Sequence, residues 1–436
     1  MTAYTGPLRM GAAHDRRLAM STPDYDVIVF GATSFVGDIL CQYLSCAAAA
    51  AGQLRWALAG RSTTKLQQLR TRLGTAGTDL PILIADADDE ASLRALCART
   101  RVIISTVGPY ALYGSTLVKV CAELGTDYCD LSGETLWIAR MIAAHEEQAR
   151  ASGARIVHCC GFDSLPSDLG VQFLQDCSYQ RHQQPCQRVR LRIRAMRGSL
   201  SGGTFASILH NVQEGVADRE VRRRMADPYA LSPKRGARQP KVSWAQYDAE
   251  QGSWLAPFLM AAINTPVVLR SHALSPGRYG ENFLYDEAIL TGPGLRGRAK
   301  ALAMSLSMAG FLAATALPPS RYLLAHYILP QPGEGPSPQE QERGFYNIEI
   351  SGRCASGQRV RVRVTGDRDP GYGSTAKMLA QAALCLAFDR SKDDFAGGFW
   401  TPATLLGAAL RQRLIAHAGL SFTDISDDRS ATSSRS

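Results

Sequence analysis

Hydroxyl and carboxyl side chains follow short apolar runs in the first half of the chain, at the points where strands of a sheet are expected to end. Tyr110 and Tyr113 follow the run 102–106, and Asp163 follows the run 155–160. A phenol or a carboxylic acid at such a point can donate a proton to a bound molecule. Tyr110, Tyr113 and Asp163 are therefore candidate catalytic residues, and simple packing is the alternative for the two tyrosines.

A glycine-containing turn lies between an apolar run and a helical pattern near residue 31. Residues 27–30 predict a buried strand, and apolar residues recur at helical spacing from Phe35. Gly31 lets the backbone turn, Gly37 lets the helix approach the sheet, and the free N–H groups at the helix start attract a pyrophosphate. Ser34 stands where the dinucleotide fingerprint has its middle glycine. We predict a dinucleotide-binding loop, with a purely structural turn as the alternative; its residues are Gly31, Thr33, Ser34, Phe35, Val36 and Gly37.

The end of the next expected strand indicates which dinucleotide is bound. Residues 54–60 are followed by Arg61, Ser62 and Lys65. An NAD-specific site would place an acid here to bind the ribose hydroxyls, whereas these three side chains suit a 2′-phosphate. We therefore predict NADP as the cofactor, and an exposed loop arginine is the alternative for Arg61.

Three further strand ends complete the predicted cofactor cleft. Asp86 ends the run 81–86 and either contacts the adenine or caps the next helix. Gly108 and Pro109 fix a turn that should pass the ribose and the nicotinamide. The runs that end near Asp130 and Gly161 place further carboxylates at the rim. The loop after residues 102–106 contributes Thr106, Val107, Gly108, Pro109 and Tyr110 to the predicted site.

The strands and helices alternate through the first 176 residues. Strands are predicted at 27–30, 54–60, 81–86, 102–106, 127–131 and 155–160, and helices at 65–73, 89–98, 115–124 and 135–151. Alternation of this kind requires parallel pairing through right-handed crossovers. The fold class is therefore α/β, with a doubly wound (Rossmann) parallel sheet in residues 23–176.

The second half has a different pattern. Residues 188–195 and 359–364 alternate arginine with aliphatic residues, which is typical of strands with one buried face. With strands also expected at 283–290 and 345–351, residues 177–374 predict an α+β domain on a mostly antiparallel sheet. The aligned arginines require acids, solvent or an anionic ligand beside them, and we expect a solvated face.

Two segments of this half are candidates for substrate or partner contact. Ser201, Gly202, Gly203 and Thr204 form a loop-to-helix turn that could let substrate approach the backbone, with a structural turn as the alternative. The basic stretch 222–241 is expected to be a solvated loop, or else to dock an acidic acyl carrier or a membrane surface. Residues 301–317 are uncharged but slightly short of the ~20 residues that a spanning helix needs, so we expect a buried or interfacial helix that could wall an acyl channel.

Composition excludes several classes of protein. The net charge is +9, yet no zinc finger, basic zipper or RNA-recognition signature is present, so no nucleic-acid partner is expected. Eleven cysteines without CxxC spacing indicate reduced thiols in a cytoplasmic compartment, and the cluster around Cys129, His158 and Cys160 lacks metal-site spacing. Residues 1–22 lack the apolar core of a signal peptide and are expected to be a disordered leader, as is the polar tail 424–436.

Several of these motifs together carry a family resemblance. The Gly31 loop, Leu58-Ala-Gly-Arg61, Thr106-Val-Gly-Pro-Tyr110, Asp127-Tyr-Cys-Asp-Leu131 and Cys160-Gly-Phe-Asp-Ser164 are followed by Ser201-Gly-Gly-Thr204, the run 366–373 and Thr401-Pro-Ala403. In this order they resemble the saccharopine dehydrogenase-like oxidoreductases, and more closely the trans-acting enoyl reductase branch. The resemblance covers nearly the whole chain, and Ser34 departs from the glycine common in the family.

The resemblance implies an NADP-type Rossmann domain with an inserted domain for substrate binding or dimerisation, onto which helices in 375–420 return. It implies an enzyme of lipid or polyketide-lipid metabolism that reduces an enoyl double bond on a carrier-bound acyl chain. We expect hydride transfer from NADPH to the β-carbon, and a proton for the α-carbon from Tyr110, Tyr113, Asp163 or solvent. We also expect a cytoplasmic protein with peripheral membrane contact, forming a homodimer.

Two other functions remain open at this point. An amino-acid oxidoreductase of the saccharopine type would use the arginine ladders to hold a dicarboxylate, although the apolar run 301–317 argues against it. A non-catalytic nucleotide-binding module would dock on lipid or on a carrier protein. No Ser/His/Asp triad signature or nucleophile elbow is present to indicate hydrolysis.

Overall fold

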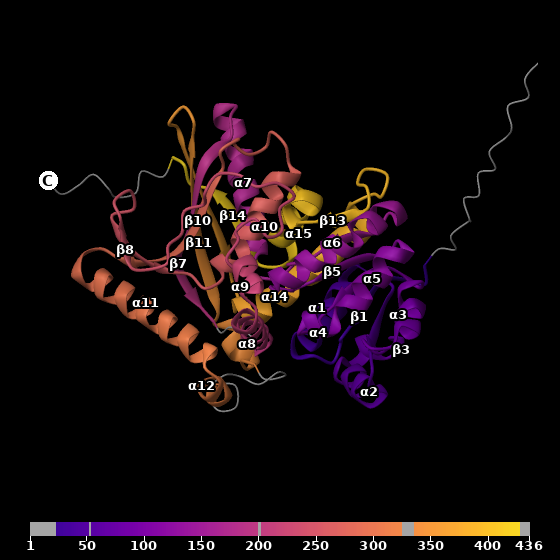
Figure 1. The fold of residues 1–436 in the computed structure, drawn as a ribbon. Coiled ribbons are helices and arrows are strands. Elements are labelled where there is room, and N and C mark those ends of the chain that lie inside the picture. Colours follow the sequence, from indigo (N-terminus) through magenta and orange to yellow (C-terminus); the bar gives the residue numbers. More distant parts are fainter. Residues whose placement is uncertain (1–22, 52–53, 199–201, 325–334, 428–436) are drawn as a thin grey trace, which may run out of the picture.

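Two seven-stranded sheets form the framework of the protein (Figure 1). The computed structural model describes residues 23–51, 54–198, 202–324 and 335–427. The expected leader 1–22 and the last part of the expected tail, 428–436, lie outside the described residues. Residues 424–427 are described and are held in place, because Arg181 pairs with both Asp424 and Asp427.

The first sheet is parallel throughout and confirms the doubly wound prediction. Its order is β13-β6-β5-β4-β1-β2-β3, so the direction of winding reverses between β1 and β4. Val27, Ile28 and Val29 are fully buried because helices cover both faces. The seventh strand, β13, was not predicted. The strands are β1 (Tyr25–Phe30), β2 (Trp56–Gly60), β3 (Ile82–Ile84), β4 (Thr100–Ser105), β5 (Asp127–Asp130), β6 (Arg155–Val157) and β13 (Gly398–Trp400).

Helices connect these strands, and two of them begin at side-chain caps. Ser62 caps α2 by accepting the N–H of Lys65, and Asp89 caps α3 by accepting the N–H of Ala91. Asp89 therefore caps the helix that follows β3. The alternative that Asp86 caps this helix was wrong. The helices are α1 (Phe35–Ala51), α2 (Thr63–Arg72), α3 (Glu90–Cys97), α4 (Tyr110–Tyr113), α5 (Ser115–Leu124) and α6 (Thr135–Ser152).

Two C-terminal helices, α14 (Thr375–Leu384) and α15 (Gly407–His417), lie beside α1. The hydroxyl of Tyr43 on α1 donates to the carbonyl of His417 at 2.9 Å, and the amide of Gln381 on α14 donates to Tyr43 at 2.7 Å. These contacts join the end of the chain to the first helix of the Rossmann unit.

The second sheet is mostly antiparallel, as predicted. Its order is β14-β12-β11-β7-β10-β9-β8, and β7 and β10 form its parallel pair. Helix α7 (Leu165–His182) leads from the first sheet to the second, and α10 (Ala261–Leu274) packs beside it. The strands are β7 (Cys186–Arg197), β8 (Gln246–Asp248), β9 (Ser253–Pro257), β10 (Leu284–Gly292), β11 (Phe345–Cys354), β12 (Arg359–Gly366) and β14 (Leu420–Asp424).

Most arginines of the two predicted ladders pair with acids, while Arg194 and Arg359 keep 45% and 57% of their side chains exposed, so the expected solvated face is only partly found. Arg192 is 2% exposed and donates to Asp286 at 2.6 Å. Glu349 on β11 lies between Arg194 at 2.8 Å and Arg361 at 2.7 Å, and these cations hold its pKa below the usual value against the opposing effect of burial. Four acids thus pair with six ladder arginines, so repulsion within the sheet is reduced but a net positive charge remains.

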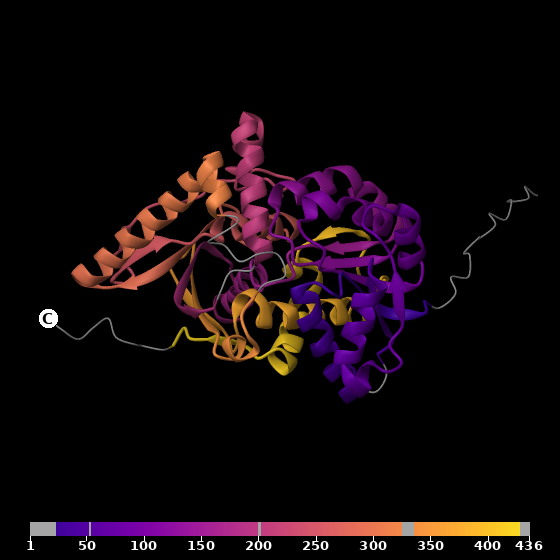
Figure 2. The ribbon, with the colours of Figure 1, turned by 90° about the horizontal axis from the view of Figure 1, so that it is seen from below.

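Five further α-helices complete the described part of the chain, and Figure 2 shows the longest of them, drawn in orange, running along the outside of the second sheet. They are α8 (Gly202–Ala217), α9 (Arg219–Met225), α11 (Gly294–Ala316), α12 (Pro318–Leu323) and α13 (Pro338–Glu342). Residues 219–225 are helical, which corrects the expectation of a loop over part of the basic stretch. Among the described helices, α11 is long and apolar enough to cross a membrane by length and composition, and 17% of its apolar stretch is buried.

Candidate active site

The turn between β1 and α1 has the geometry of a dinucleotide loop. Gly31 has a φ of +87°, and a Cβ at this position would lie 2.7 Å from Cγ2 of Val107. A Cβ at Gly37 would collide with the carbonyl oxygen of Gly31. Both positions therefore require glycine, one for its backbone conformation and one for close approach of the helix to the turn.

Ser34 replaces the middle glycine without closing the loop. Its hydroxyl accepts the N–H of Gly37 at 3.0 Å and donates to Oγ1 of Thr106 at 3.0 Å, so the side chain turns back onto the helix start. The N–H groups of Phe35 and Val36 have no hydrogen-bond partner among the described residues. Two free amides at a helix start can bind a phosphate, so the loop retains its anion-binding capacity.

The end of β2 carries a cation that suits a second phosphate. Arg61 is exposed and has no ion pair or hydrogen bond with any described residue. Lys65 is exposed on α2, whereas the Ser62 hydroxyl already accepts the Lys65 N–H at 3.4 Å. Asp86 accepts the N–H of Asp88 at 3.2 Å, and its contact with adenine stays a prediction.

The loop after β4 is attached to the dinucleotide loop. Thr106 donates from Oγ1 to the carbonyl of Gly31 at 2.9 Å, and Val107 packs against Gly31. Pro109 precedes the short helix α4, which begins at Tyr110. The structure thus brings the two predicted cofactor loops into direct contact.

Glu134 connects this loop to the second domain, a role that was not assigned from the sequence. It is fully buried and accepts the backbone N–H groups of Tyr110 and Ala111, each at 2.8 Å. It also accepts the hydroxyl of Ser207 on α8 at 2.8 Å. This carboxylate therefore fixes α8 relative to the carboxyl edge of the parallel sheet.

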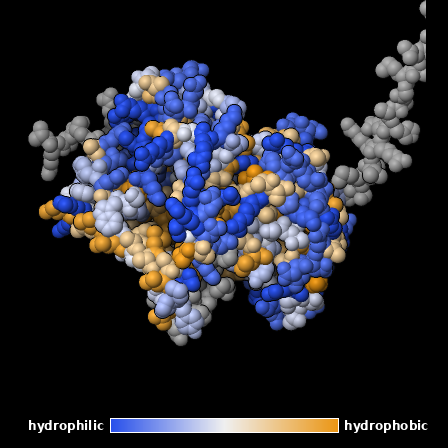
Figure 3. All heavy atoms as spheres, in the orientation of Figure 1, coloured by the Kyte–Doolittle hydropathy of each residue, from blue (hydrophilic) through white to orange (hydrophobic). Residues whose placement is uncertain are grey.

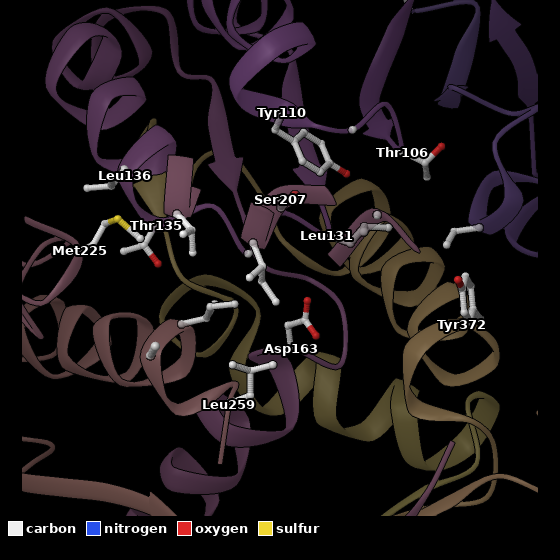
Figure 4. Close-up of a pocket in the computed structure, with 18 of the residues that line it drawn as sticks. Thr106, Tyr110, Leu131, Thr135, Leu136, Asp163, Ser207, Met225, Leu259 and Tyr372 are labelled. Carbon is white, nitrogen blue, oxygen red and sulfur yellow. The ribbon is translucent and has the colours of Figure 1, made fainter. Parts of the chain in front are cut away.

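A cavity of about 290 Å³ lies beside these loops, between the edge of the parallel sheet, α8 and the start of α10 (Figure 4). Its wall is mostly apolar, and no Lys, Arg or His is among the described residues that form it. An apolar chain fits such a wall, whereas a dicarboxylate would find no cation. The lining includes Phe35, Val36, Tyr110, Leu131, Leu136, Asp163, Ile208, Val212, Met225, Leu259, Ile263, Leu312 and Tyr372.

Asp163 is the carboxyl group of this cavity (Figure 4). It makes no hydrogen bond or ion pair with the described residues, and burial raises its pKa to about 7. Its neighbours are fixed, because the N–H of Phe162 donates to Thr375 at 3.0 Å and the hydroxyl of Ser164 donates to Asn264 at 3.1 Å. A positioned carboxyl group with a pKa near neutrality can act as a proton donor.

The two candidate tyrosines are placed differently. Tyr110 lines the cavity, but its hydroxyl donates to the carbonyl of Ser105 at 3.0 Å and its ring stacks on Trp137 at 5.4 Å. Burial raises the pKa of Tyr110 well above the usual value, which makes it a weak acid. Tyr113 is 39% exposed and is not among the residues that line the cavity.

The predicted substrate turn is only partly described. Gly202 and Gly203 begin α8, the N–H of Gly202 donates to the hydroxyl of Tyr372 at 2.9 Å, and Gly203 lines the cavity. Ser201 and the side chain of Thr204 lie outside the described residues.

The cysteine and histidine cluster behind the cavity does not form a metal centre. Nδ1 of His158 lies 2.7 Å from Oδ2 of Asp130, and Cys129 and Cys160 are buried free thiols. Over the described part of the chain, no group of three or more His, Cys, Asp or Glu side chains could hold a metal ion.

Comparisons with known proteins agree with this geometry. The family model of the saccharopine dehydrogenase NADP binding domain matches residues 27–157. The trans-acting enoyl reductases of Mycobacterium bovis (strain BCG / Pasteur 1173P2) and Mycobacterium leprae (strain TN) are 36% and 34% identical to the chain, and each match covers 90% of this chain and 96% of the relative. A Mycobacterium tuberculosis protein (strain ATCC 25618 / H37Rv), whose name assigns it provisionally to the same activity, is 40% identical over 92% of this chain and 98% of its own.

The fold is also found in a solved structure. The apo histidine-tagged saccharopine dehydrogenase (L-Glu forming) from Saccharomyces cerevisiae matches 92% of this chain and 99% of its own with a TM-score of 0.51. At 13% identity this likeness concerns the fold alone. The chain thus belongs to the trans-acting enoyl reductase family of saccharopine dehydrogenase-like oxidoreductases, and it is an NAD(P)-dependent oxidoreductase with a nucleotide-binding Rossmann domain.

Proposed function

We propose that the protein is an NADPH-dependent enoyl reductase that acts on an α,β-unsaturated acyl chain. The observation that carries this proposal is the unpartnered carboxyl group of Asp163 in an apolar cavity beside the dinucleotide loop. An acyl chain suits the wall of the cavity, and reduction of its double bond requires one hydride and one proton. The names of the mycobacterial relatives support the same reaction.

Residues of the parallel sheet would hold the cofactor. The free amides of Phe35 and Val36 suit the pyrophosphate, and the exposed guanidinium of Arg61, with Lys65, suits a 2′-phosphate. The loop from Thr106 to Pro109 would flank the ribose and the nicotinamide. When bound, NADPH supplies the hydride. NADPH carries a 2′-phosphate that NADH lacks, so a contact between this phosphate and Arg61 would favour NADPH.

The chain itself supplies the proton and the apolar surroundings. The β-carbon of the substrate gains a hydride, the α-carbon gains the proton of Asp163, and the carbon–carbon double bond becomes a single bond. The Asp163 carboxylate is then reprotonated from solvent, which is feasible because its pKa is about 7. Leu259 and Ile263 contribute apolar side chains to the lining of the same cavity.

Amino-acid chemistry of the saccharopine type is less compatible with the cavity. A dicarboxylate substrate requires cations, but the described lining residues include none. The arginine ladders are occupied by Asp286, Glu349 and Glu250. The sequence-based rival that depended on these ladders therefore loses its main support.

Stopped-flow absorbance of NADPH with a trans-2-enoyl thioester tests the proposal. We expect NADPH oxidation with the enoyl thioester and none with the matched saturated thioester. A second arm presents saccharopine with NADP, and a third presents each nicotinamide cofactor without substrate in a binding measurement. Turnover with saccharopine alone would favour the amino-acid reaction, and cofactor binding without turnover of any substrate would favour a non-catalytic module.

A further inference from the structure

Helix α11 has its large apolar residues on the outside. Gly297, Ala301 and Ser305 are buried against the sheet, whereas Leu295 is 82% exposed and Leu306 is 61% exposed. A surface helix of a soluble protein normally shows the reverse arrangement, with apolar residues inward and polar residues outward. The outer face of α11 therefore lacks a partner among the described residues.

The apolar face continues over α12. Leu317 and Leu323 are 60% and 53% exposed, and Figure 3 shows hydrophobic side chains gathered along these two helices. We call this the α11–α12 surface; its large exposed apolar residues are Leu295, Met304, Leu306, Leu317 and Leu323. Contiguous apolar patches of this kind mark interaction sites.

Basic side chains that form no ion pair with the described residues lie near the start of α11. Arg296 and Lys300 are exposed and form no ion pair with any described residue. The guanidinium of Arg298 lies over the ring of Trp254, which also contacts Tyr247. The sequence contains no Asp or Glu from residue 288 to residue 333. A partner that presents negative charge beside an apolar phase would therefore complement this surface.

We propose that the α11–α12 surface binds the surface of an anionic lipid bilayer, with α11 lying along the membrane plane. Lipid phosphates would pair with Arg296 and Lys300, while Leu306 and Leu317 enter the acyl region. If two copies of the chain met through this same surface, the apolar residues would be covered, but no acid would face Arg296 and Lys300. A second copy therefore complements these cations less well than an anionic bilayer does. A spanning arrangement would require α11 to leave β9 and β10, against which its inner face packs.

The inner face of α11 reaches the cavity. Leu312 of α11 is 43% exposed and also lines the cavity, and Phe311 contacts Phe205 of α8 at 6.1 Å between ring centroids. An acyl chain bound in the cavity would thus lie beside the helix that we propose to rest on the membrane. This part of the inference rests on the proposed enoyl reductase function, whereas the membrane contact itself does not.

Vesicle sedimentation of the full chain tests the membrane contact without any turnover. We expect binding to vesicles that contain phosphatidylglycerol, weaker binding to pure phosphatidylcholine, and release by salt. Leu306→Glu should lower the affinity about tenfold or more, because burial of one leucine contributes at least that factor. Ile415→Glu on α15 is the matched control, since Ile415 is 49% exposed but lies outside the α11–α12 surface, and it should bind like the wild type.

Three outcomes would overturn the membrane proposal. In the first, the wild type does not sediment with anionic vesicles. In the second, Leu306→Glu and Ile415→Glu lose the same amount of vesicle affinity. In the third, analytical ultracentrifugation shows a wild-type dimer that Leu306→Glu dissociates. NADPH oxidation with a short soluble enoyl thioester is measured in parallel without vesicles. Vesicle binding without such oxidation would contradict only the enoyl reductase proposal, and oxidation without vesicle binding would contradict only the membrane proposal.

Discussion

The hydroxyl of Ser34 accepts the backbone N–H of Gly37 at 3.0 Å. In a loop with glycine at position 34, this amide would point freely toward the phosphate site together with those of Phe35 and Val36. Ser34 instead uses it to cap α1, and a second hydrogen bond to Thr106 joins the two cofactor loops. The chain thus exchanges one potential phosphate contact for a more rigid loop.

Replacement of Ser34 tests this exchange. Ser34→Ala removes the cap and should lower the free energy of unfolding by about 1 kcal/mol, whereas Ser34→Gly should lower it by only a few tenths. Ser34→Gly should also bind NADPH at least as tightly as the wild type, because it frees the N–H of Gly37. Urea unfolding and fluorescence titration with NADPH measure the two effects. A Ser34→Ala variant as stable as the wild type would show that the cap contributes nothing.

Selectivity for the 2′-phosphate should depend on Arg61. Arg61→Ala removes a charge-assisted contact worth roughly 1.5–3 kcal/mol, so the Kd for NADPH should rise about ten- to a hundredfold while the Kd for NADH changes little. Arg101→Ala removes the same charge near the start of β4, where Arg101 lies 3.8 Å from Asp26, and serves as the control. Equal losses for both cofactors in Arg61→Ala would rule out the 2′-phosphate contact.

The sequence predicts the parallel sheet well because its signals are local. The apolar run before Gly31 and the helical spacing of apolar residues from Phe35 each indicate one element without reference to distant residues. Strand β13 was missed, since Gly398–Trp400 is too short to show a period. The paired arginines were misjudged for a different reason, because only the register of β7 and β11 brings Glu349 near Arg194.

The site was predicted in part, and the missing part comes from the second domain. Gly31 and Thr106 could be recognised from their places at strand ends, and Gly37 from its place at the start of the following helix. The bond between Glu134 and Ser207 joins residues 73 positions apart, and neither has a pattern that indicates the other. Leu312 likewise reaches the cavity only because α11 ends beside α8. Such contacts follow from domain packing, which a single sequence does not reveal.

The proton donor can be identified from the pH dependence of turnover. Asp163 donates a proton only while it is protonated, so kcat should fall as the pH rises through its pKa of about 7. Asp163→Asn should lower kcat about a hundredfold or more and remove this pH dependence, because general acid catalysis contributes at least that factor. Stopped-flow oxidation of NADPH from pH 5.5 to 8.5 (a span of roughly 1.5 pH units on either side of that pKa) measures both effects.

A carboxyl group of similar pKa outside the cavity provides the control for this experiment. Glu287 has a pKa raised to about 7 and does not line the cavity. Glu287→Gln retains an oxygen that can accept the amide of Asn264, so kcat and its pH profile should stay close to the wild type. An unchanged pH profile in Asp163→Asn would exclude Asp163 as the donor and leave solvent as the source of the proton.

Ionisation of Glu287 should affect the pH dependence of the unfolding free energy and not that of turnover. Burial raises its pKa from 4.5 to about 7, although Tyr285 and Asn264 donate hydrogen bonds to it. The folded protein therefore binds this proton more tightly than the unfolded chain does. The resulting stabilisation is fully present below pH 4.5 and is lost as the pH rises through about 7.

The variant Glu287→Gln tests this effect because glutamine cannot ionise. As the pH rises over this range, the unfolding free energy of the variant should increase relative to that of the wild type by up to about 3 kcal/mol. Urea unfolding of both proteins across the range measures this difference, in which the titration of Asp163 and Asp168 cancels because both proteins share it. A difference that does not depend on pH would mean that Glu287 is already ionised in the folded protein and that its two hydrogen bonds outweigh its burial.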